Sequence, residues 1–231
     1  MTDWPRYRPV ADHALLVSFG TEIGDEMSAQ VLALDARLAE NTPVGVVEWV
    51  PALVNLLIDF DPEATDHGAL QAEIERMLTN PAQTRVESTE RIVEVCYDAD
   101  FAPDLAAVAE TTGHDPEAVV RAHLDAAYRV RMYGFSPGYA YMSGVPEAIQ
   151  VPRKPAAVRD VPAGSVIIAG PQCLVTTLTM PTGWSIIGRS PTRIMRSEAD
   201  HPFLFDVGDS VRFVQIDRAT FDDRLAEGAD G

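Results

Sequence analysis

Residues 161–190 have the sequence VPAGSVIIAGPQCLVTTLTMPTGWSIIGRS, and the pattern of this segment indicates the fold class of the C-terminal half of the chain. Short apolar runs within it alternate with turns that contain Gly or Pro. Closely spaced short strands joined by such turns are typical of a β-barrel or a sandwich rather than a doubly wound parallel sheet. The strands that this pattern predicts here and downstream span residues 165–169, 174–180, 185–187, 193–195, 203–205 and 211–216.

The N-terminal part of the chain alternates strand and helix patterns. An apolar run at residues 14–19 predicts a buried strand, and apolar residues at helical spacing predict a helix over residues 25–40. Two strands follow at residues 44–50 and 53–60, and a second helix begins near Asp66, a residue type suited to the N-cap. This β-α-β-β-α order predicts a small α+β domain with both helices on one face of the sheet, because each element has one apolar side to bury.

A change of pattern between residues 80 and 90 predicts a linker, since this segment is polar and lacks apolar periodicity. A strand at residues 91–97 and two short helices follow, and β character returns at residues 127–133. The fold class that we expect is α+β. We expect its two domains to span residues 1–85 and 86–231.

The charge of the chain argues against several classes of partner. The formal net charge is −17, from 35 acidic and 18 basic residues. Such a field repels polyanions, so neither nucleic acid nor an anionic membrane surface is expected as a partner. The two short helices resemble a helix-turn-helix, with Gly113 ending the first and Asp115 capping the second. The second helix offers only Arg121 and His123 as cations, which is too few for a recognition helix.

Cysteine and histidine usage predicts neither a disulfide nor a metal site. Cys96 and Cys173 lie in strand-like surroundings and are expected to be buried free thiols. The five histidines show no short paired spacing, so no metal is predicted. The first residues lack a signal-peptide pattern, and no apolar run reaches the length of about 20 residues that spans a bilayer. We therefore expect a cytoplasmic protein.

A pocket is predicted where Gly, Pro and aromatic residues recur in the C-terminal half. Gly134 to Tyr141 has the sequence GFSPGYAY, in which glycine allows close approach by a ligand and aromatic rings supply apolar walls. Arg153 lies at the edge of a proline-containing segment, where a guanidinium could hold a substrate carboxylate or could pair with a nearby acid. The candidate substrate-binding residues are Phe135, Pro137, Gly138, Tyr139, Arg153, Ser165 and Trp184.

Three residues are candidates for the chemistry itself. His123 precedes the GFSPGYAY segment and could act as an acid or a base, although a helical histidine is more often hydrogen-bonded within the fold. Gln172 offers an amide that could recognise a lactam or ureido group, with a turn role as an equal competitor. Arg189 could hold a carboxylate or a carboxyl-phosphate, with a structural salt bridge as the alternative.

Several motifs in order make the chain resemble a known family. The motifs are Tyr133 to Met142 (YGFSPGYAYM), Val161 to Val166 (VPAGSV), Gly170 to Gln172 (GPQ), Pro181 to Trp184 (PTGW), Ile187 to Ser190 (IGRS) and Val207 to Phe213 (VGDSVRF). Together they resemble the family that contains the B-type subunit of bacterial 5-oxoprolinase, allophanate hydrolase subunit 1 and a sporulation kinase inhibitor. The resemblance covers nearly the whole chain.

The resemblance implies a fold, a partner and a reaction. It implies a small N-terminal α+β sandwich followed by a cyclophilin-like β-barrel of the carboxyltransferase type. The implied partners are a homologous second subunit, similar to allophanate hydrolase subunit 2 or to the C-type subunit of 5-oxoprolinase, and a lactam-opening third subunit. ATP would be used at the level of the complex, which converts 5-oxoproline to glutamate. The alternatives are an allophanate hydrolase or urea carboxylase-related subunit, and a non-enzymatic histidine kinase inhibitor.

The chain departs from the family pattern after Gln172. Relatives have Gln-Thr-Gly-Ile/Val-Tyr-Pro there, whereas residues 172–177 of this chain are QCLVTT. Residues 165–168 are SVII in place of Ser-Val-Gly-Ile. Replacing glycine with a bulky residue removes access to positive φ and fills space beside the backbone. An altered substrate range and a loss of the usual activity are therefore open alternatives to the usual reaction.

Overall fold

The computed structural model describes residues 4–79, 88–196 and 202–229, with the side chains of residues 228 and 229 excepted. The chain divides into two compact units, residues 1–87 and 88–231. Of the linker predicted at residues 80–90, residues 80–87 lie outside the described residues, and Glu90 already begins a strand. Within the described residues, every helix is too short or too polar to cross a lipid bilayer.

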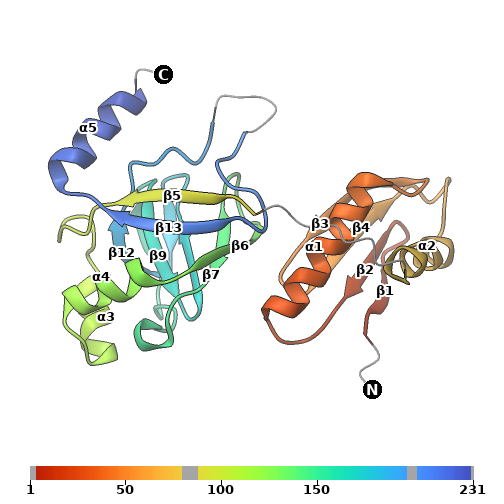
Figure 1. Cartoon of the computed structure of the whole chain (residues 1–231), viewed down its shortest axis with the longest axis horizontal. Coiled ribbons are helices and arrows are strands. Elements are labelled where there is room, and N and C mark those ends of the chain that lie inside the picture. The colour runs from red at the N-terminus through yellow and green to blue at the C-terminus, as the bar shows by residue number, and fades with distance from the viewer. Residues whose placement is uncertain (1–3, 80–87, 197–201, 230–231) are drawn as a thin grey trace. The chain divides into compact units, whose positions relative to one another are not determined.

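The N-terminal unit is a four-stranded antiparallel sheet covered by two helices (Figure 1). The strand order is β1-β2-β4-β3. Leu34 and Ile74 from the helices share one buried cluster with Leu56 and Ile58 of the sheet, as the sequence predicts. The elements are β1 (Arg6–Val10), β2 (Ala14–Ser18), α1 (Asp25–Glu40), β3 (Val46–Pro51), β4 (Asn55–Phe60) and α2 (His67–Thr79).

Local chemistry explains most of these elements, but not β1. The Asp66 carboxylate accepts a hydrogen bond from the Ala69 backbone N–H at 2.9 Å, which confirms the predicted start of α2. β1 has the sequence RYRPV and lacks a clear apolar alternation, so it was not predicted. It forms because its backbone pairs with β2, with Arg6 opposite Ser18 and Val10 opposite Ala14.

The C-terminal unit is a nearly closed β-barrel. Its seven-stranded sheet has the order β12-β9-β10-β7-β6-β13-β5. The two edges meet at Cys96 and Arg189, whose backbones exchange hydrogen bonds of 2.8 and 2.9 Å. A separate ribbon pairs β8 (Val158–Val161) with β11 (Met180–Thr182). The barrel strands are β5 (Glu90–Val95), β6 (Tyr128–Tyr133), β7 (Ala140–Ser143), β9 (Ser165–Ala169), β10 (Gln172–Val175), β12 (Ser185–Arg189) and β13 (Ser210–Gln215).

The barrel is accompanied by α3 (Leu105–Thr112), α4 (Pro116–Asp125) and α5 (Arg218–Ala229), with a 3-10 turn at Glu147–Ile149. In Figure 1, α3 and α4 lie below the barrel strands and α5 lies above them. Gly113 ends α3 with φ of 73°, and the Asp115 carboxylate caps α4 by accepting from the Ala118 N–H at 2.6 Å. Both signals were present in the sequence.

Three strand predictions in this unit were wrong. The run predicted as one strand at residues 174–180 is interrupted, because the Thr177 hydroxyl donates to the Pro137 carbonyl at 2.7 Å outside the sheet. The strands predicted at 193–195 and 203–205 amount to an isolated bridge between Met195 and Phe203.

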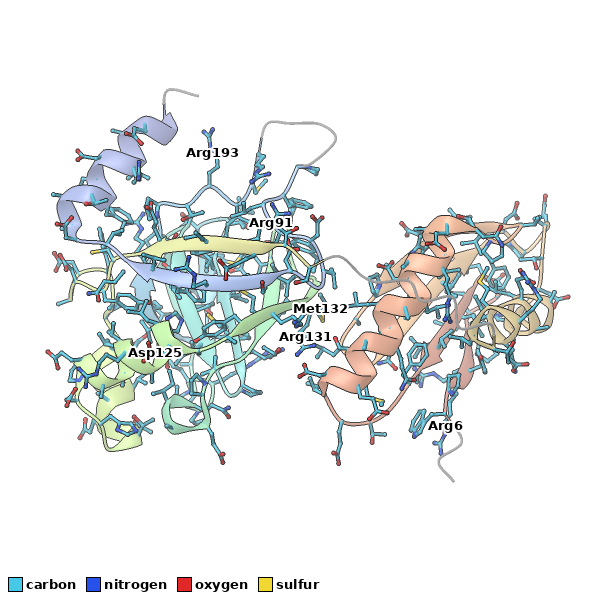
Figure 2. All side chains as sticks on the ribbon, in the orientation of Figure 1. Arg6, Arg91, Asp125, Arg131, Met132 and Arg193 are labelled. Atoms are coloured by element: carbon cyan, nitrogen blue, oxygen red, sulfur yellow. The ribbon has the colours of Figure 1, made fainter. Side chains whose placement is uncertain are left out.

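A buried carboxylate connects β5 to the start of β13. Asp209 is 2% exposed and accepts hydrogen bonds from the Thr89 N–H (2.9 Å), the Asp206 N–H (3.0 Å) and Arg91 Nε (2.7 Å). Arg91 is labelled on β5 in Figure 2. The bonds satisfy a charge that would otherwise be costly to bury.

Candidate functional site

A pocket of about 190 Å³ with aromatic walls lies in the barrel unit. It brings together four residues that the sequence predicts for substrate binding, from segments as far apart as Phe135 and Trp184. The sequence did not predict three lining residues that lie on strands, because strand residues carry no local signal of facing a pocket. They are Ile167, Leu174 and Thr182. The lining residues are Phe135, Tyr139, Tyr141, Arg153, Ile167, Leu174, Pro181, Thr182, Gly183 and Trp184.

The aromatic walls are held by ring contacts. Tyr141 meets Trp184 edge to face, with ring centroids 5.9 Å apart and planes at 68°. Phe135 packs against Tyr139 at 5.5 Å. The Tyr139 hydroxyl donates to the Met180 sulfur at 2.5 Å, and burial raises the Tyr139 pKa to about 12. Tyr139 is therefore protonated at neutral pH and serves as a wall and a donor, not as a base.

Phe135 occupies a strained turn at the rim of this pocket. Its φ is 71°, and the Ser136 N–H donates to the Gly134 carbonyl at 2.9 Å, which closes a three-residue γ-turn. A non-glycine residue in this conformation costs on the order of 1–3 kcal/mol, and such strain concentrates at functional sites. The Phe135 side chain is nevertheless 75% exposed. A large apolar ring is thus presented to solvent beside the pocket at a conformational cost.

Arg153 supplies the charge of this pocket. Its Cζ atom lies 5.5 Å from the centre of the Trp184 ring, within cation–π range. It is the one charged group among the lining residues, and within the described parts of the chain it forms no ion pair. The guanidinium is exposed at the rim, so its donors are available to a carboxylate entering from solvent.

Three other predicted binding residues support the neighbouring loops without lining the aromatic pocket. The Pro137 carbonyl accepts from Thr177, and Gly138 has φ of 75° beside the Thr177 side chain. Ser165 is buried, and its hydroxyl donates to the Pro162 carbonyl at 2.8 Å. These contacts set the shape of the turns. Direct substrate contact by these three residues stays a prediction.

His123 lies in the barrel interior and does not line the pocket. The imidazole is fully buried, with Nδ1 2.8 Å from the Tyr97 hydroxyl and Nε2 3.7 Å from the Cys173 sulfur. Burial lowers the His123 pKa to about 3 and raises that of the Cys173 thiol. The imidazole is therefore neutral at pH 7 and has no access to solvent. A catalytic role for His123 stays a prediction.

Gln172 and Arg189 are likewise outside the pocket lining. Gln172 begins β10, where it is in register with Ser143 and Ala169. Arg189 is at the barrel closure, with its guanidinium 5.4 Å from the Phe101 ring and 5.8 Å from the Phe221 ring. Partial burial and the nearby Arg218 lower the pKa of Arg189. The three predicted catalytic residues thus have three separate surroundings.

Both cysteines are buried free thiols, as expected from their surroundings. Within the described residues, no cluster of three or more His, Cys, Asp or Glu side chains is arranged to hold a metal ion. The aromatic pocket itself combines apolar ring walls with the exposed guanidinium of Arg153.

The fold and the pocket define a two-unit α+β protein whose nearly closed barrel carries a small pocket with aromatic walls. A sequence model of the carboxyltransferase domain, subdomain C and D, matches residues 5–205. The chain belongs to this carboxyltransferase family, which confirms the resemblance inferred from the motifs.

Two curated relatives and one solved structure extend this assignment. The chain is 34% identical to the B-type subunit of 5-oxoprolinase from Bacillus subtilis (strain 168), over 90% of this chain and 91% of that protein. It is 36% identical to the corresponding 5-oxoprolinase subunit of Escherichia coli O157:H7, over 73% of this chain and 78% of that protein. The crystal structure of TTHA0988 superposes with a TM-score of 0.79 at 31% identity, over 89% of this chain. This chain spans 40% of the length of TTHA0988.

Proposed function

We propose that this chain is a subunit of an ATP-dependent complex that hydrolyses 5-oxoproline to glutamate. The names of the relatives support a 5-oxoprolinase subunit. The observation that carries the proposal is the aromatic pocket with the Arg153 guanidinium exposed at its rim. Those features match a small ring that carries a carboxylate, because aromatic walls suit the ring and Arg153 suits the acid.

In this proposal the chain binds and orients the lactam. Arg153 holds the carboxylate, while Tyr141 and Trp184 flank the ring. Phe135 limits the access of water from its place at the rim. A homologous second subunit and a lactam-opening third subunit complete the complex, and ATP is consumed at the level of that complex. His123, Gln172 and Arg189 receive no chemical step, because none of them lines the pocket.

The test is glutamate formation from 5-oxoproline by the reconstituted complex, with and without ATP. Replacing Arg153 with alanine should raise KM for 5-oxoproline by about tenfold or more, because a charge-assisted hydrogen bond is lost. Arg153→Lys should fall between the parent and the alanine variant, since it keeps the charge but not the fork. Arg159→Ala is the matched control, because Arg159 is also exposed but does not line the pocket.

Three outcomes would count against the proposal. A verified complex that forms no glutamate would refute it. Turnover of urea or allophanate in place of 5-oxoproline would move the chain to the alternative enzymatic class. Equal effects of Arg153→Ala and Arg159→Ala on KM would remove the pocket as the binding site, even in an active complex.

A further inference from the structure

Lys154 connects Arg153, which carries the charge of the pocket, to the turn that bears Trp184 in the pocket wall. It follows Arg153 directly and is the single lysine of a chain in which the other basic residues are arginines. Its backbone N–H donates to the Gly183 carbonyl at 2.6 Å. Gly183 directly precedes Trp184, and the Arg153 guanidinium lies over the Trp184 ring. The peptide bearing Arg153 is therefore tied to the turn that bears Trp184.

The side chain of Lys154 makes a second connection. Its Nζ lies 2.5 Å from Asp104 Oδ2, and the two side chains are 19% and 24% exposed. The same Asp104 oxygen accepts from the Ile186 N–H at 2.7 Å, and the Asp104 N–H donates to the Ile186 carbonyl at 3.1 Å. Asp104 thus joins Lys154 to β12 just after Trp184. The pair holds both sides of the Trp184 position.

Asp104 makes these bonds in place of an ordinary local one. It is the N-cap residue of α3, where an aspartate usually accepts a hydrogen bond from the first turn of its own helix. Here the side chain makes no cap hydrogen bond. Its charge is directed to Lys154 and to the backbone of β12 instead. The local stabilisation that a capping aspartate provides is therefore given up for a contact beside the pocket.

The segment around Arg153 depends on such anchors because it has no regular structure of its own. Residues 151–154 form neither helix nor strand. Before Arg153 in the sequence, the Val151 carbonyl accepts a hydrogen bond from the Gly170 N–H at 2.8 Å. After Arg153, the anchors are the backbone and side-chain bonds of Lys154. An exposed arginine with a long flexible side chain loses less conformational entropy on binding if its backbone is already fixed.

We propose that the Asp104–Lys154 pair is a positioning device that holds Arg153 over Trp184 in the geometry that receives a ligand carboxylate. That Arg153 receives a ligand carboxylate rests on the proposed function, whereas the positioning of Arg153 against Trp184 does not. The pair acts through Arg153 and touches no substrate. Lysine suits this task because a compact ammonium directs its charge to one carboxylate oxygen and leaves the planar fork to Arg153.

The first experiment measures the indole N–H resonance of Trp184 in the full chain without ligand. The chain has three tryptophans, so Trp184→Phe identifies the signal. Arg153→Ala defines the shift caused by loss of the guanidinium from the ring. Lys154→Met should move the Trp184 resonance in the same direction, and Lys154→Arg should return it most of the way. Asp104→Asn should act like Lys154→Met while keeping an acceptor for the Ile186 N–H.

The second experiment measures kinetics in the complete complex. Lys154→Met and Asp104→Asn should each raise KM for 5-oxoproline by about tenfold with kcat nearly unchanged, because positioning of a binding group is lost. Arg212→Met is the control, since it breaks an ion pair of the same unit, Arg212 with Glu90 at 3.5 Å, that is not part of the pocket. It should change neither KM nor the Trp184 resonance.

The outcomes separate the two proposals. If Lys154→Met and Asp104→Asn lower thermal stability but leave the Trp184 resonance at its parental position, the pair is only structural and the inference is wrong. If the resonance shifts as expected but the complex has no activity on 5-oxoproline, the positioning stands and the proposed substrate fails. If one variant does not fold, the other decides, because they remove opposite members of the pair.

Discussion

Replacing His123 with phenylalanine should remove a large part of the acid sensitivity of the barrel unit. The imidazole is fully buried, and burial lowers its pKa to about 3 in the folded state, against an ordinary value of 6.5. Between these values the unfolded chain binds a proton that the folded chain does not. The folded state is therefore favoured above pH 6.5, and this stability is lost progressively as the pH falls toward 3.

The size of the effect follows from the difference between the two pKa values. The His123 imidazole alone should make the parent about 2 kcal/mol less stable at pH 5 than at pH 7. The His123→Phe variant should lack this contribution. It should also show a pH-independent loss of about 1–3 kcal/mol, because the Tyr97 hydroxyl loses its partner at Nδ1. Phenylalanine suits the site, since the imidazole packs against Tyr128 and Phe213.

The assay is urea unfolding at several pH values between about 4.5 and 7.5, followed through Trp184 in the barrel unit. The useful quantity is the difference in unfolding free energy between parent and variant, because contributions from the many carboxylates cancel in it. The same substitution at exposed His114 is the control for the loss of a histidine from the barrel unit. A parent-minus-variant difference that stays constant over this range would overturn the assignment of a buried neutral imidazole.

Further predictions concern the framework of the barrel unit. Asp209→Ala should cost about 3–5 kcal/mol in urea unfolding, because three donors, including Arg91, lose a buried acceptor; Asp209→Asn should cost less. Phe221→Ala should speed hydrogen exchange throughout α5, since the Phe221 ring packs at 4.5 Å on Phe101 and anchors the helix; unchanged exchange would contradict this anchoring. Gly164→Ala should destabilise more than Gly170→Ala in thermal unfolding, because both have positive φ but only the former meets the Ser190 carbonyl.

Local signals in the sequence predicted much of the secondary structure. The spacing of Val31, Leu34 and Leu38 predicts α1, and these residues are buried as expected. Caps at Asp66 and Asp115 also work as predicted, because a capping carboxylate acts on N–H groups three residues away. α5 was missed because its apolar periodicity is weak. Its cap was a usable signal, since the Asp217 carboxylate accepts from the Thr220 N–H at 2.8 Å.

The pocket was predicted in part. Gly and Pro punctuation marks loops in which aromatic and cationic side chains are conspicuous. This pattern was enough to predict four lining residues: Phe135, Tyr139, Arg153 and Trp184. The same Gly and Pro punctuation does not show whether a catalytic candidate lies in the core or in a site. His123 has a helix-borne position that fits either a core or a site, and only its neighbours show that it is buried.

Turn chemistry, periodicity and ordered motifs are local properties, and they specify the class of the fold, the family and the set of loops from which a pocket is made. Which side chains meet depends on the tertiary structure. The barrel closes only when Cys96 pairs with Arg189, far along the chain, and the Asp104–Lys154 contact forms only when α3 meets the loop beside Trp184. Such long-range pairs depend on how the strands are arranged in space, and neither partner carries a local sign of the other.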